Sequence, residues 1–344
     1  MNKKELKCQI CGENTNLKHN NYIGYQEPDK FRIYHCNNCN TASAFPRVDT
    51  SLLYENIYNS GNRVPGYHRY WKYASMILKV SKPINYLSKN ESTYWGVNHA
   101  LNKIVDNKKK TKILEVGSGM GYLTFSLKMA DYDIIGLDIS KTAVEKAIEN
   151  FGNHYQYADV YEFSEEKPES ADIIILTEVI EHIEEPVKFL KALKKILKPG
   201  GSLIITTPNK TTYPKNIIWA SDSPPVHYWW FAEKSFKYIA DILNFEISFI
   251  DFTNHFKKNY MSIDISKENQ NITPLPFLNE VGQLKDESKK KLGGYFAGIL
   301  RTVGQVALIK NIYLKVNDFF KSDNDIIVCG KRGPVLCVIL KKID

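Results

Sequence analysis

The sequence has no long apolar stretch: although 43% of its 344 residues are hydrophobic, no run of 18 uncharged apolar residues occurs. A helix that crosses a bilayer needs about 20 predominantly apolar residues in a row, so we expect no transmembrane helix. The first residues, Met-Asn-Lys-Lys-Glu-Leu-Lys-Cys, also lack the apolar core of a secretory signal peptide. These two absences favour a cytoplasmic location.

Concentrated arginine patches are absent as well. The net charge of +8 comes largely from lysines, which are spread along the chain rather than gathered in one segment. This spread argues against a dedicated nucleic-acid-binding face, whereas a basic protein suits an acidic small-molecule substrate such as a nucleotide-activated sugar. The length and the hydrophobic content allow one full α/β domain with accessory segments and a substantial core.

Cysteine is scarce, and four of the six cysteines stand in two pairs, Cys8-Gln-Ile-Cys11 and Cys36-Asn-Asn-Cys39, about 24 residues apart. Thiolates at this spacing converge on one tetrahedral zinc ion, with all four positions filled and none left open for catalysis. Two disulfides are the alternative, which a reducing cytosol disfavours. We therefore expect a structural zinc ion bound by Cys8, Cys11, Cys36 and Cys39.

A glycine-rich turn follows the first apolar run of the central region. Gly117, Gly119 and Gly121 alternate behind residues 113–116, and a helical pattern and a second apolar run ending at Asp138 come next. This order of strand, tight turn, helix and strand is half of a nucleotide-binding α/β fold, in which glycines let the backbone approach a ligand. An acid about 20 residues after the loop is the usual partner of a ribose. The loop by itself is also compatible with a nicotinamide dinucleotide.

Four further motifs decide between these cofactors. With the glycine loop they run from about residue 112 to residue 209, in order and at family spacing, and through them the chain resembles class I S-adenosylmethionine (SAM)-dependent methyltransferases of the type 11 and type 23 groups. The resemblance implies SAM as the cofactor. The motifs are Glu115-Val-Gly-Ser-Gly-Met-Gly121, Gly136-Leu-Asp-Ile-Ser140, Tyr157-Ala-Asp-Val160, Asp172-Ile-Ile-Ile-Leu-Thr-Glu-Val-Ile-Glu-His182 and Leu197-Lys-Pro-Gly-Gly-Ser-Leu-Ile-Ile-Thr-Thr-Pro-Asn209.

The alternation of strands and helices predicts an α/β fold with a parallel sheet and right-handed crossovers. The resemblance adds that the sheet is a Rossmann-like, seven-stranded methyltransferase sheet with an antiparallel last strand. The predicted strands are 112–117, 133–138, 154–158, 172–177, 202–207, 246–252 and 335–340, and the predicted helices lie near 121–130, 140–151, 185–197 and 233–243.

The chain divides into three predicted segments. Residues 1–45 form a zinc-ribbon-like module with two short strands between the cysteine pairs, 46–108 form a helical cap or linker rich in Tyr and Trp, and 109–344 form the methyltransferase domain. An insertion, 254–333, precedes the last strand. Its stretch 290–320 is amphipathic and basic, and we interpret it as a helical cap over the substrate pocket, with a membrane-surface or oligomer contact as the alternative.

The resemblance also assigns cofactor-binding residues. It implies that Asp138 accepts hydrogen bonds from both ribose hydroxyls, which two carboxylate oxygens allow, that Ile139 packs on the adenine, and that Asp159 accepts from the adenine amino group. Glu115 is implied at the amino-acid end of SAM. The implied cofactor-binding set is Glu115, Gly117, Ser118, Gly119, Gly121, Asp138, Ile139, Asp159, Val160 and Thr177.

An acidic turn, Thr177-Glu-Val-Ile-Glu-His-Ile183, follows the fourth predicted strand, at the sheet edge where open α/β folds bind ligands. The spacing predicts Glu178, Glu181 and His182 together on one helical turn, where two carboxylates and an imidazole can hold a divalent metal. The string resembles the magnesium or manganese site of quinone-biosynthesis and small-RNA 2′-O-methyltransferases. It also occurs in relatives without a metal, where the first Glu and the His shape the pocket. Metal ligand, general base and packing residue therefore stay open for His182.

A second histidine stands in the segment Pro224-Pro-Val-His-Tyr-Trp-Trp-Phe231, which we expect to be a proline-stiffened loop. This segment resembles that of bacterial methyltransferases with an N-terminal zinc ribbon, many of which belong to sugar and surface-glycan pathways. An imidazole with an ordinary pKa near 6.5 suits deprotonation of a hydroxyl at neutral pH. We therefore predict His227, His182 and Glu178 as the catalytic residues, with a structural role for His227 as the alternative.

The predicted function is transfer of the SAM methyl group to a small-molecule acceptor, with a hydroxyl of a sugar or glycan precursor preferred and carbon as a further possible acceptor atom. One alternative is an RNA-modifying methyltransferase, in which the zinc ribbon and the lysines bind RNA. The other is a SAM-binding protein without catalytic activity, against which the intact glycine loop and Asp138 argue.

Overall fold

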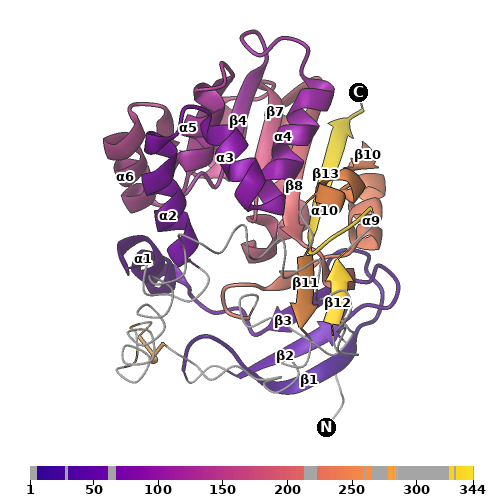
Figure 1. Cartoon of the computed structure of the whole chain (residues 1–344). Helices are drawn as coiled ribbons and strands as arrows, with labels where there is room; N and C mark the ends of the chain where they lie inside the picture. The colour runs from indigo at the N-terminus through magenta and orange to yellow at the C-terminus, as the bar shows by residue number, and fades with distance from the viewer. Residues whose placement is uncertain are drawn as a thin grey trace.

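The computed structural model describes residues 6–27, 30–60, 67–212, 223–258, 261–264, 278–281, 283, 285, 325–328 and 331–343. A seven-stranded sheet with helices on both faces forms its centre, and a smaller four-stranded sheet lies below it in Figure 1, close to the N-terminus.

The large sheet has the strand order β10-β13-β8-β7-β4-β5-β6. Strands β4 to β8 run parallel to one another, whereas β13 is antiparallel to both of its neighbours. The reversed strand is the one that the sequence predicts, and the predicted Rossmann-like α/β fold with a seven-stranded sheet is confirmed. The strands are β4 (Lys112–Val116), β5 (Asp133–Asp138), β6 (Tyr155–Tyr157), β7 (Ala171–Thr177), β8 (Leu197–Pro208), β10 (Phe245–Phe249) and β13 (Val335–Lys342).

The central strands are apolar on both faces because helices cover both sides of the sheet. Along β7, Ile174 and Leu176 pack on one face while Ile173 and Ile175 pack on the other, as the two-residue period of a strand requires. The first face carries α7 (Val160–Glu166), α8 (Pro186–Ile196) and α9 (Glu233–Leu243), and the second carries α4 (Ser92–Ile104), α5 (Tyr122–Lys128) and α6 (Lys141–Phe151).

The four helices that the sequence predicts in this domain, α5, α6, α8 and α9, begin and end within two residues of the predicted bounds. Helix α7 is an addition to the prediction. It is one short amphipathic segment that begins directly after Asp159, whose side chain caps its first turn by accepting from the backbone N–H groups of Tyr161 and Glu162.

The smaller sheet has the order β1-β2-β3-β9. The sequence predicts two strands between the cysteine pairs, and these are β1 (Asn16–Ile23) and β2 (Lys30–His35). Strand β3 (Ala42–Phe45) follows the second cysteine pair. The fourth strand, β9 (Trp229–Trp230), comes from the segment for which we expected a loop, and it pairs antiparallel with β3. The N-terminal sheet is therefore completed by residues of the large domain.

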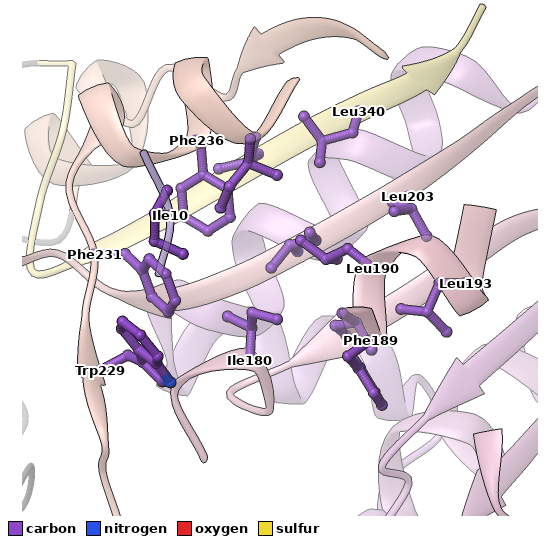
Figure 2. Close-up of a cluster of buried hydrophobic side chains, with 14 of the residues drawn as sticks. Ile10, Ile180, Phe189, Leu190, Leu193, Leu203, Trp229, Phe231, Phe236 and Leu340 are labelled. Carbon is purple, nitrogen blue, oxygen red and sulfur yellow. The ribbon is translucent and has the colours of Figure 1, made fainter. Parts of the chain in front are cut away.

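One hydrophobic cluster joins the N-terminal sheet to the large domain. Ile10 lies with Phe231 and Phe236 in the same buried cluster as Leu190 of α8 and Leu340 of β13 (Figure 2). Burial of large apolar side chains is the main stabilising term in folding, at roughly 25 cal/mol per Å² of apolar surface. The cysteine-containing segment thus shares its core with the α/β domain.

The segment 46–108 contains α1 (Ser51–Ser60), α2 (His68–Met76), a 3-10 turn η2 (Ile77–Lys79), α3 (Pro83–Asn90) and α4. Of the predicted insertion, the structure describes α10 (Thr253–Lys258) and the paired strands β11 (Met261–Asp264) and β12 (Asp325–Val328), whereas 290–320 lies outside the described residues. Among the described residues, no helix has the length and the apolar character needed to span a bilayer.

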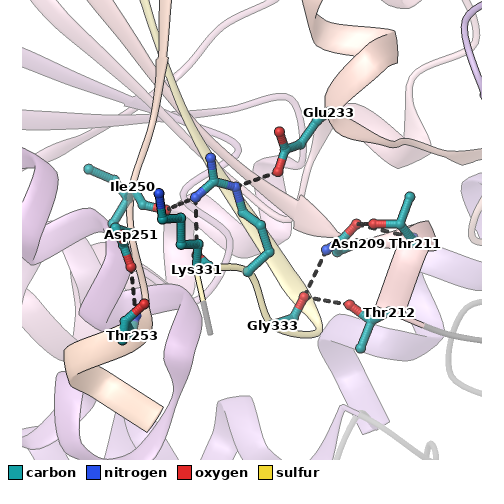
Figure 3. Close-up of polar contacts among 10 residues, drawn as sticks. Asn209, Thr211, Thr212, Glu233, Ile250, Asp251, Thr253, Lys331 and Gly333 are labelled. Carbon is teal, nitrogen blue, oxygen red and sulfur yellow. Dashed lines mark hydrogen bonds and ion pairs between the residues drawn. The ribbon is translucent and has the colours of Figure 1, made fainter. Parts of the chain in front are cut away.

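The chain returns to β13 through a turn fixed by hydrogen bonds to its backbone. The carbonyl of Gly333 accepts from Nδ2 of Asn209 at 2.9 Å and from Oγ1 of Thr212 at 2.6 Å (Figure 3). Both donors follow β8, and Thr212 ends the short turn η4 (Lys210–Thr212). These bonds set the antiparallel register of β13 against β8 at the sheet edge where the parallel strands end.

Candidate functional site

The glycine loop takes the conformation that its sequence requires. Gly117, Gly119 and Gly121 have φ angles of 75°, 49° and 79°, in the left-handed region that residues with a Cβ rarely adopt. A Cβ at position 117 would lie 2.5 Å from Cγ2 of Val179, whereas one at position 119 would meet only the ring of Tyr58, at 3.6 Å or more. The loop therefore packs tightly against Val179 at Gly117, whereas Tyr58 lies at van der Waals distance from Gly119.

Asp138 ends β5 and is held against this loop. Its Oδ2 accepts from the N–H of Gly119 at 2.7 Å, and its Oδ1 accepts from the N–H of Ser140 at 2.8 Å. Burial raises the pKa of the Asp138 carboxyl, and the backbone hydrogen bonds oppose that effect. Each carboxylate oxygen keeps a second lone pair, so both can still accept from a ribose hydroxyl.

A cavity of about 370 Å³ opens beside this carboxylate. Its lining includes five of the predicted cofactor-binding residues, Gly117, Asp138, Ile139, Asp159 and Val160. Ile139 is 66% exposed, which is unusual for isoleucine. A flat apolar ligand in the cavity would cover it. The cavity runs from the glycine loop to the N-terminus of α7, the arrangement expected for an adenosine.

Other predicted cofactor residues lie outside the lining of the cavity. Glu115 is buried inside β4, where its carboxyl accepts a short hydrogen bond from Oγ1 of Thr124. Burial raises the pKa of Glu115 to about 8, with the bond from Thr124 opposing it, so this side chain is largely protonated at neutral pH. Ser118 is also buried, and Thr177 ends β7. The role of Glu115 at the amino-acid end of SAM stays a prediction.

The acidic turn after β7 differs from the helical turn that the sequence predicts. Glu178 has a φ of 54°, a rare and strained conformation for a side chain of its size, and a 3-10 turn, η3 (Ile180–His182), follows it. Among the described residues, the acid that groups with His182 is Glu181, and the third member is His227 rather than Glu178. The reversal of the backbone at Glu178 separates it from the other two residues of the predicted triplet.

The two predicted catalytic histidines lie against each other. Their ring centroids are 4.6 Å apart, with the rings nearly perpendicular. Nδ1 of His182 lies 2.6 Å from the carbonyl of Val226, an acceptor only, so the neutral ring carries its hydrogen on Nδ1. Nδ1 of His227 is buried without a hydrogen-bond partner among the described residues. His182 lines the cavity, whereas His227 lies against its ring and is not among the lining residues.

Burial sets the charge of both imidazoles. It lowers the pKa of His182 to about 4, against smaller opposing effects from the carbonyls of Val226 and Glu178. It also holds the pKa of His227 well below its ordinary value, with His182 and Arg69 adding to the shift. The expectation of an ionisation near neutral pH, made for His227, does not agree with this shift, because the buried ring is not solvated as a pKa near 6.5 requires.

Glu181 stands beside this pair and is completely buried. Its Oε2 accepts from Oγ1 of Thr207 at 2.9 Å, and its Oε1 lies 3.9 Å from Nε2 of His182. One carboxylate oxygen and one ring nitrogen from each histidine lie within 4.8 Å of one another. One carboxylate and two neutral imidazoles form a donor set that can hold a divalent transition metal.

Two tyrosines of α1 cover the site, and neither was among the predicted site residues. The ring of Tyr54 is 6.2 Å from that of His182, and the ring of Tyr58 lies over Gly119. Nζ of Lys146 on α6 donates to the carbonyl of Tyr58 at 2.7 Å, which holds α1 in place. The four-residue spacing puts both rings on one face of a helix, and that spacing was the available signal.

The four cysteines of the two pairs converge, as their spacing predicts. Sγ of Cys8 is 3.5 Å from that of Cys39, and Sγ of Cys11 is 3.4 Å from that of Cys36, with all four sulfurs within 4.8 Å of one another. A disulfide needs about 2.05 Å. A tetrahedron with zinc–sulfur bonds of about 2.3 Å has edges near 3.8 Å, so the donor set fits one zinc ion.

Comparison with known proteins gives one family match, at residues 89–248, to a model described as "Methyltransferase domain". The mitochondrial ubiquinone biosynthesis O-methyltransferase of Dictyostelium discoideum is 31% identical over 191 residues, which are 45% of this chain and 60% of that protein. The ubiquinone biosynthesis O-methyltransferase of Aliivibrio fischeri is 31% identical over 119 residues, 32% of this chain and 50% of that protein. The chain thus spans at most 60% of the length of these relatives.

Among solved structures, a SAM dependent methyltransferase from Archaeoglobus fulgidus aligns with a TM-score of 0.41 at 18% identity, over 72% of this chain and 93% of that one. The family match and the names of the curated relatives agree with the glycine loop and with the order of the large sheet. Residues 89–248 therefore resemble a methyltransferase domain.

Proposed function

We propose that this protein transfers the SAM methyl group to a hydroxyl oxygen of a small-molecule acceptor, with a sugar or glycan precursor as the first candidate. The observation that carries this proposal is the pair of neutral histidines beside the cavity that Asp138 lines. The names of the two curated relatives, both O-methyltransferases, support oxygen as the acceptor atom.

SAM, when bound, supplies a methyl group on a sulfonium for an in-line displacement, so the protein mainly has to hold and orient two reactants. We propose that Asp138 binds the ribose hydroxyls, that Ile139 covers the adenine and that Asp159 accepts from its amino group. All three line the same cavity. Tyr58 on α1 closes the open side of the glycine loop at Gly119, which supports a role in excluding water from the cofactor.

The proton of the acceptor hydroxyl needs a base, and His227 is the side chain that we propose for it. Its buried Nδ1 is without a hydrogen-bond partner among the described residues, and its low pKa keeps the ring neutral and able to accept. His182 is fixed by its bond to the carbonyl of Val226, the residue before His227. We assign it the orientation of the loop and of the neighbouring ring.

The acidity of the acceptor separates two candidate classes. Proton transfer is most efficient when the two pKa values are not far apart, and burial makes both imidazoles weak bases. A phenolic hydroxyl, with a pKa near 10, is far easier to deprotonate than the hydroxyl of a sugar. A phenol is therefore the second candidate acceptor, favoured by the low pKa values of His182 and His227.

A divalent cation bound by Glu181, His182 and His227 would also make the acceptor hydroxyl easier to deprotonate, because a bound metal lowers the pKa of a coordinated hydroxyl. The three ligand atoms lie close enough for one ion. Dialysis against a chelator followed by addition of a divalent transition metal, such as manganese or zinc, distinguishes the two routes. Activity that returns only with added metal favours the cation, and activity that survives the chelator favours His227 as the base.

The proposed function is tested by incubating the protein with methyl-labelled SAM and separate pools of nucleotide sugars, phenols and RNA. Asp138→Ala, with weakened SAM binding, is the control and should incorporate less label at a limiting SAM concentration. Label in the first or second pool identifies the acceptor class. Label in RNA alone would instead support the RNA-modifying alternative. Firm SAM binding without label in any pool would favour a SAM-binding protein without catalytic activity.

We also propose that Cys8, Cys11, Cys36 and Cys39 bind one structural zinc ion. Four thiolates complete the tetrahedron, so the ion has no open position at which to take part in the reaction. The sulfur–sulfur distances support this assignment. The segment 1–45 is then a zinc ribbon, with the cap at 46–108 and the methyltransferase domain from 109 onward as the remaining proposed divisions of the chain.

A further inference from the structure

The N-terminal sheet holds the segment that carries His227. Ala42 and Ser43 of β3 pair with Trp230 and Trp229 of β9, which begins two residues after His227. The N–H of Ala44 also donates to the carbonyl of Tyr228 at 3.0 Å. The backbone that follows the proposed base is thereby a strand of the cysteine-containing sheet.

The side chain of Arg47 also contacts both β3 and the segment after His227. Its guanidinium lies 4.7 Å from the ring centroid of Phe45, 4.4 Å from that of Tyr228 and 4.8 Å from that of Trp229. Nη1 donates to the carbonyl of Ala44 at 2.9 Å and more distantly to that of Tyr228. Cation–π attraction to these rings offsets part of the cost of burying the guanidinium. Burial still lowers the pKa of Arg47 to about 10, and Nε and Nη2 have no hydrogen-bond partner among the described residues.

The second cysteine pair is tied to the large domain as well. Oγ1 of Thr41 donates to Oγ of Ser235 at 2.7 Å, and Oγ of Ser235 donates to the carbonyl of Cys39 at 3.2 Å. The hydroxyl of Tyr238 donates to Oδ1 of Asn38 at 2.9 Å. Ser235 and Tyr238 belong to α9, which follows β9 directly, so the knuckle and the histidine segment have a common support.

The beginning of the histidine segment is held from the other side of the sheet. The N–H of Tyr25 donates to the carbonyl of Pro224 at 2.7 Å, and Tyr25 packs with Val226 and Leu53 in one buried cluster. The carbonyl of Val226 accepts from His182. Tyr25, in the connection between β1 and β2, thus contacts the segment before His227, and β3 contacts it after His227. The first of these contacts reaches His182 through Val226.

We propose that Arg47, which follows β3, is a positioning residue that holds residues 224–231 against the N-terminal sheet and sets the geometry of the two histidines. The proposal rests on the proposed function for its catalytic consequence, although not for its structural one. Displacement of a catalytic group by about 1 Å costs on the order of 10²-fold in rate, so a support of this kind controls turnover without touching SAM or the acceptor.

The test compares Arg47→Met with Arg32→Met, because Arg32 is an exposed arginine of the same sheet. In Arg47→Met we expect amide hydrogen exchange in 224–231 to become at least about tenfold faster while exchange in 112–140 is unchanged. SAM affinity by calorimetry should stay within about twofold, and kcat should fall roughly 10- to 100-fold. Arg32→Met should match the wild type in all three measurements.

Arg47→Lys is the second variant, since it keeps the charge but loses the planar group that stacks on the rings. It should give a smaller increase in the rate of amide hydrogen exchange in 224–231. It also keeps the test possible if Arg47→Met fails to fold. Cys36→Ser should lower the zinc content and speed exchange in the same segment. In the double variant with Arg47→Met and Cys36→Ser, kcat should fall by much less than the product of the fold-changes in the two single variants, because both substitutions act through one contact.

Wild-type exchange in 224–231 with either Arg47 variant overturns the proposal, whatever the activity. Faster exchange throughout the chain in both variants also overturns it, since Arg47 would then support the whole fold rather than this segment. Absence of methyl transfer by the wild type to any acceptor rejects the proposed function alone, because the exchange measurement still decides whether Arg47 holds the histidine segment.

Discussion

Burial changes the pKa values of the ionisable side chains of the site more than charged neighbours do. Burial raises the pKa of Glu115 and lowers that of His182, and in both cases it favours the neutral form. Burial also raises the pKa of Asp138, but hydrogen bonds from the backbone N–H groups of Ser140, Gly119 and Ile139 oppose that effect. Asp138 is therefore the carboxylate of the loop best suited to bind a polar ligand as an anion.

Asp138→Ala should weaken SAM binding at least about tenfold. The substitution removes charge-assisted hydrogen bonds worth roughly 1.5–3 kcal/mol, and 1.4 kcal/mol corresponds to a factor of ten. It also frees the N–H groups of Gly119 and Ser140, so Asp138→Asn should have a milder effect. Calorimetry measures both, with Asp133→Ala at the exposed start of β5 as the control. Unchanged affinity in folded Asp138→Ala would reject the ribose assignment.

His227→Ala should lower kcat by roughly 10²–10⁴-fold with little change in SAM affinity, as expected when a general base is lost. Because burial keeps both imidazoles neutral, the wild-type rate should be flat between about pH 7 and 9 and fall only below about pH 6. His182→Ala is the comparison. If it carries the larger rate loss while His227→Ala stays active, the base has been assigned to the wrong ring.

Glu115→Gln tests whether the buried carboxyl is structural. A pKa raised from 4.5 to about 8 means that the folded protein keeps a proton that the unfolded chain releases. The stability from this proton is complete below pH 4.5 and is lost as the pH rises to about 8, by on the order of 1–4 kcal/mol. Denaturant unfolding at pH 6 and pH 8.5 measures this loss in the free energy of unfolding. The wild type and Glu145→Gln, a control at an exposed position, should both lose stability between these pH values, whereas Glu115→Gln should lose much less. A tenfold loss of SAM affinity would instead restore the predicted role at the amino-acid end.

At the scale of elements, the sequence predicts what is encoded locally. Apolar runs bounded by glycine or proline give β4, β7 and β8, and the position of Asp138 after β5 follows from motif spacing. Strand β9 has no such signal: two tryptophans become a strand only because β3, far away in sequence, offers its edge. The proximity of His182 and His227 is non-local in the same way, and the pKa values follow from burial that a linear sequence does not display.

The cysteine cluster supports a prediction at this scale. The purified protein should contain about one zinc per chain, and Cys36→Ser should lose most of it while still binding SAM, because the cofactor cavity contains no cysteine. Cys337→Ala removes a buried thiol outside the cluster and should keep the metal. Metal analysis and thiol titration measure this directly. Wild-type protein without metal and with four reactive thiols in this cluster would contradict the zinc assignment.

At the scale of the whole molecule, the N-terminal segment and the α/β domain are one folded body. Metal-binding ribbons of this size cannot bury enough apolar surface to fold without their ion. Here Ile10, Phe31 and Ile33 belong to the same cluster as Phe236, Leu203 and Leu340. The large domain therefore supplies most of the core of the N-terminal segment, and that segment in turn covers Trp229 and Phe231 beside the histidine segment.

Ile10→Ala should therefore destabilise the whole chain rather than the ribbon alone. Ile10 is 3% exposed within this cluster, and truncation of such a residue to alanine typically costs about 2–5 kcal/mol. Leu17→Ala on β1 is the matched control, because Leu17 is 45% exposed and a surface change of this kind stays within about 0.5 kcal/mol. Tryptophan fluorescence, far-ultraviolet circular dichroism and loss of SAM binding should report one shared denaturant transition, shifted to lower concentration in Ile10→Ala. Two separate transitions, of which the SAM-binding one is unaffected by Ile10→Ala, would mean that the N-terminal segment folds on its own. That result would contradict the inference that a common core supports the histidine segment.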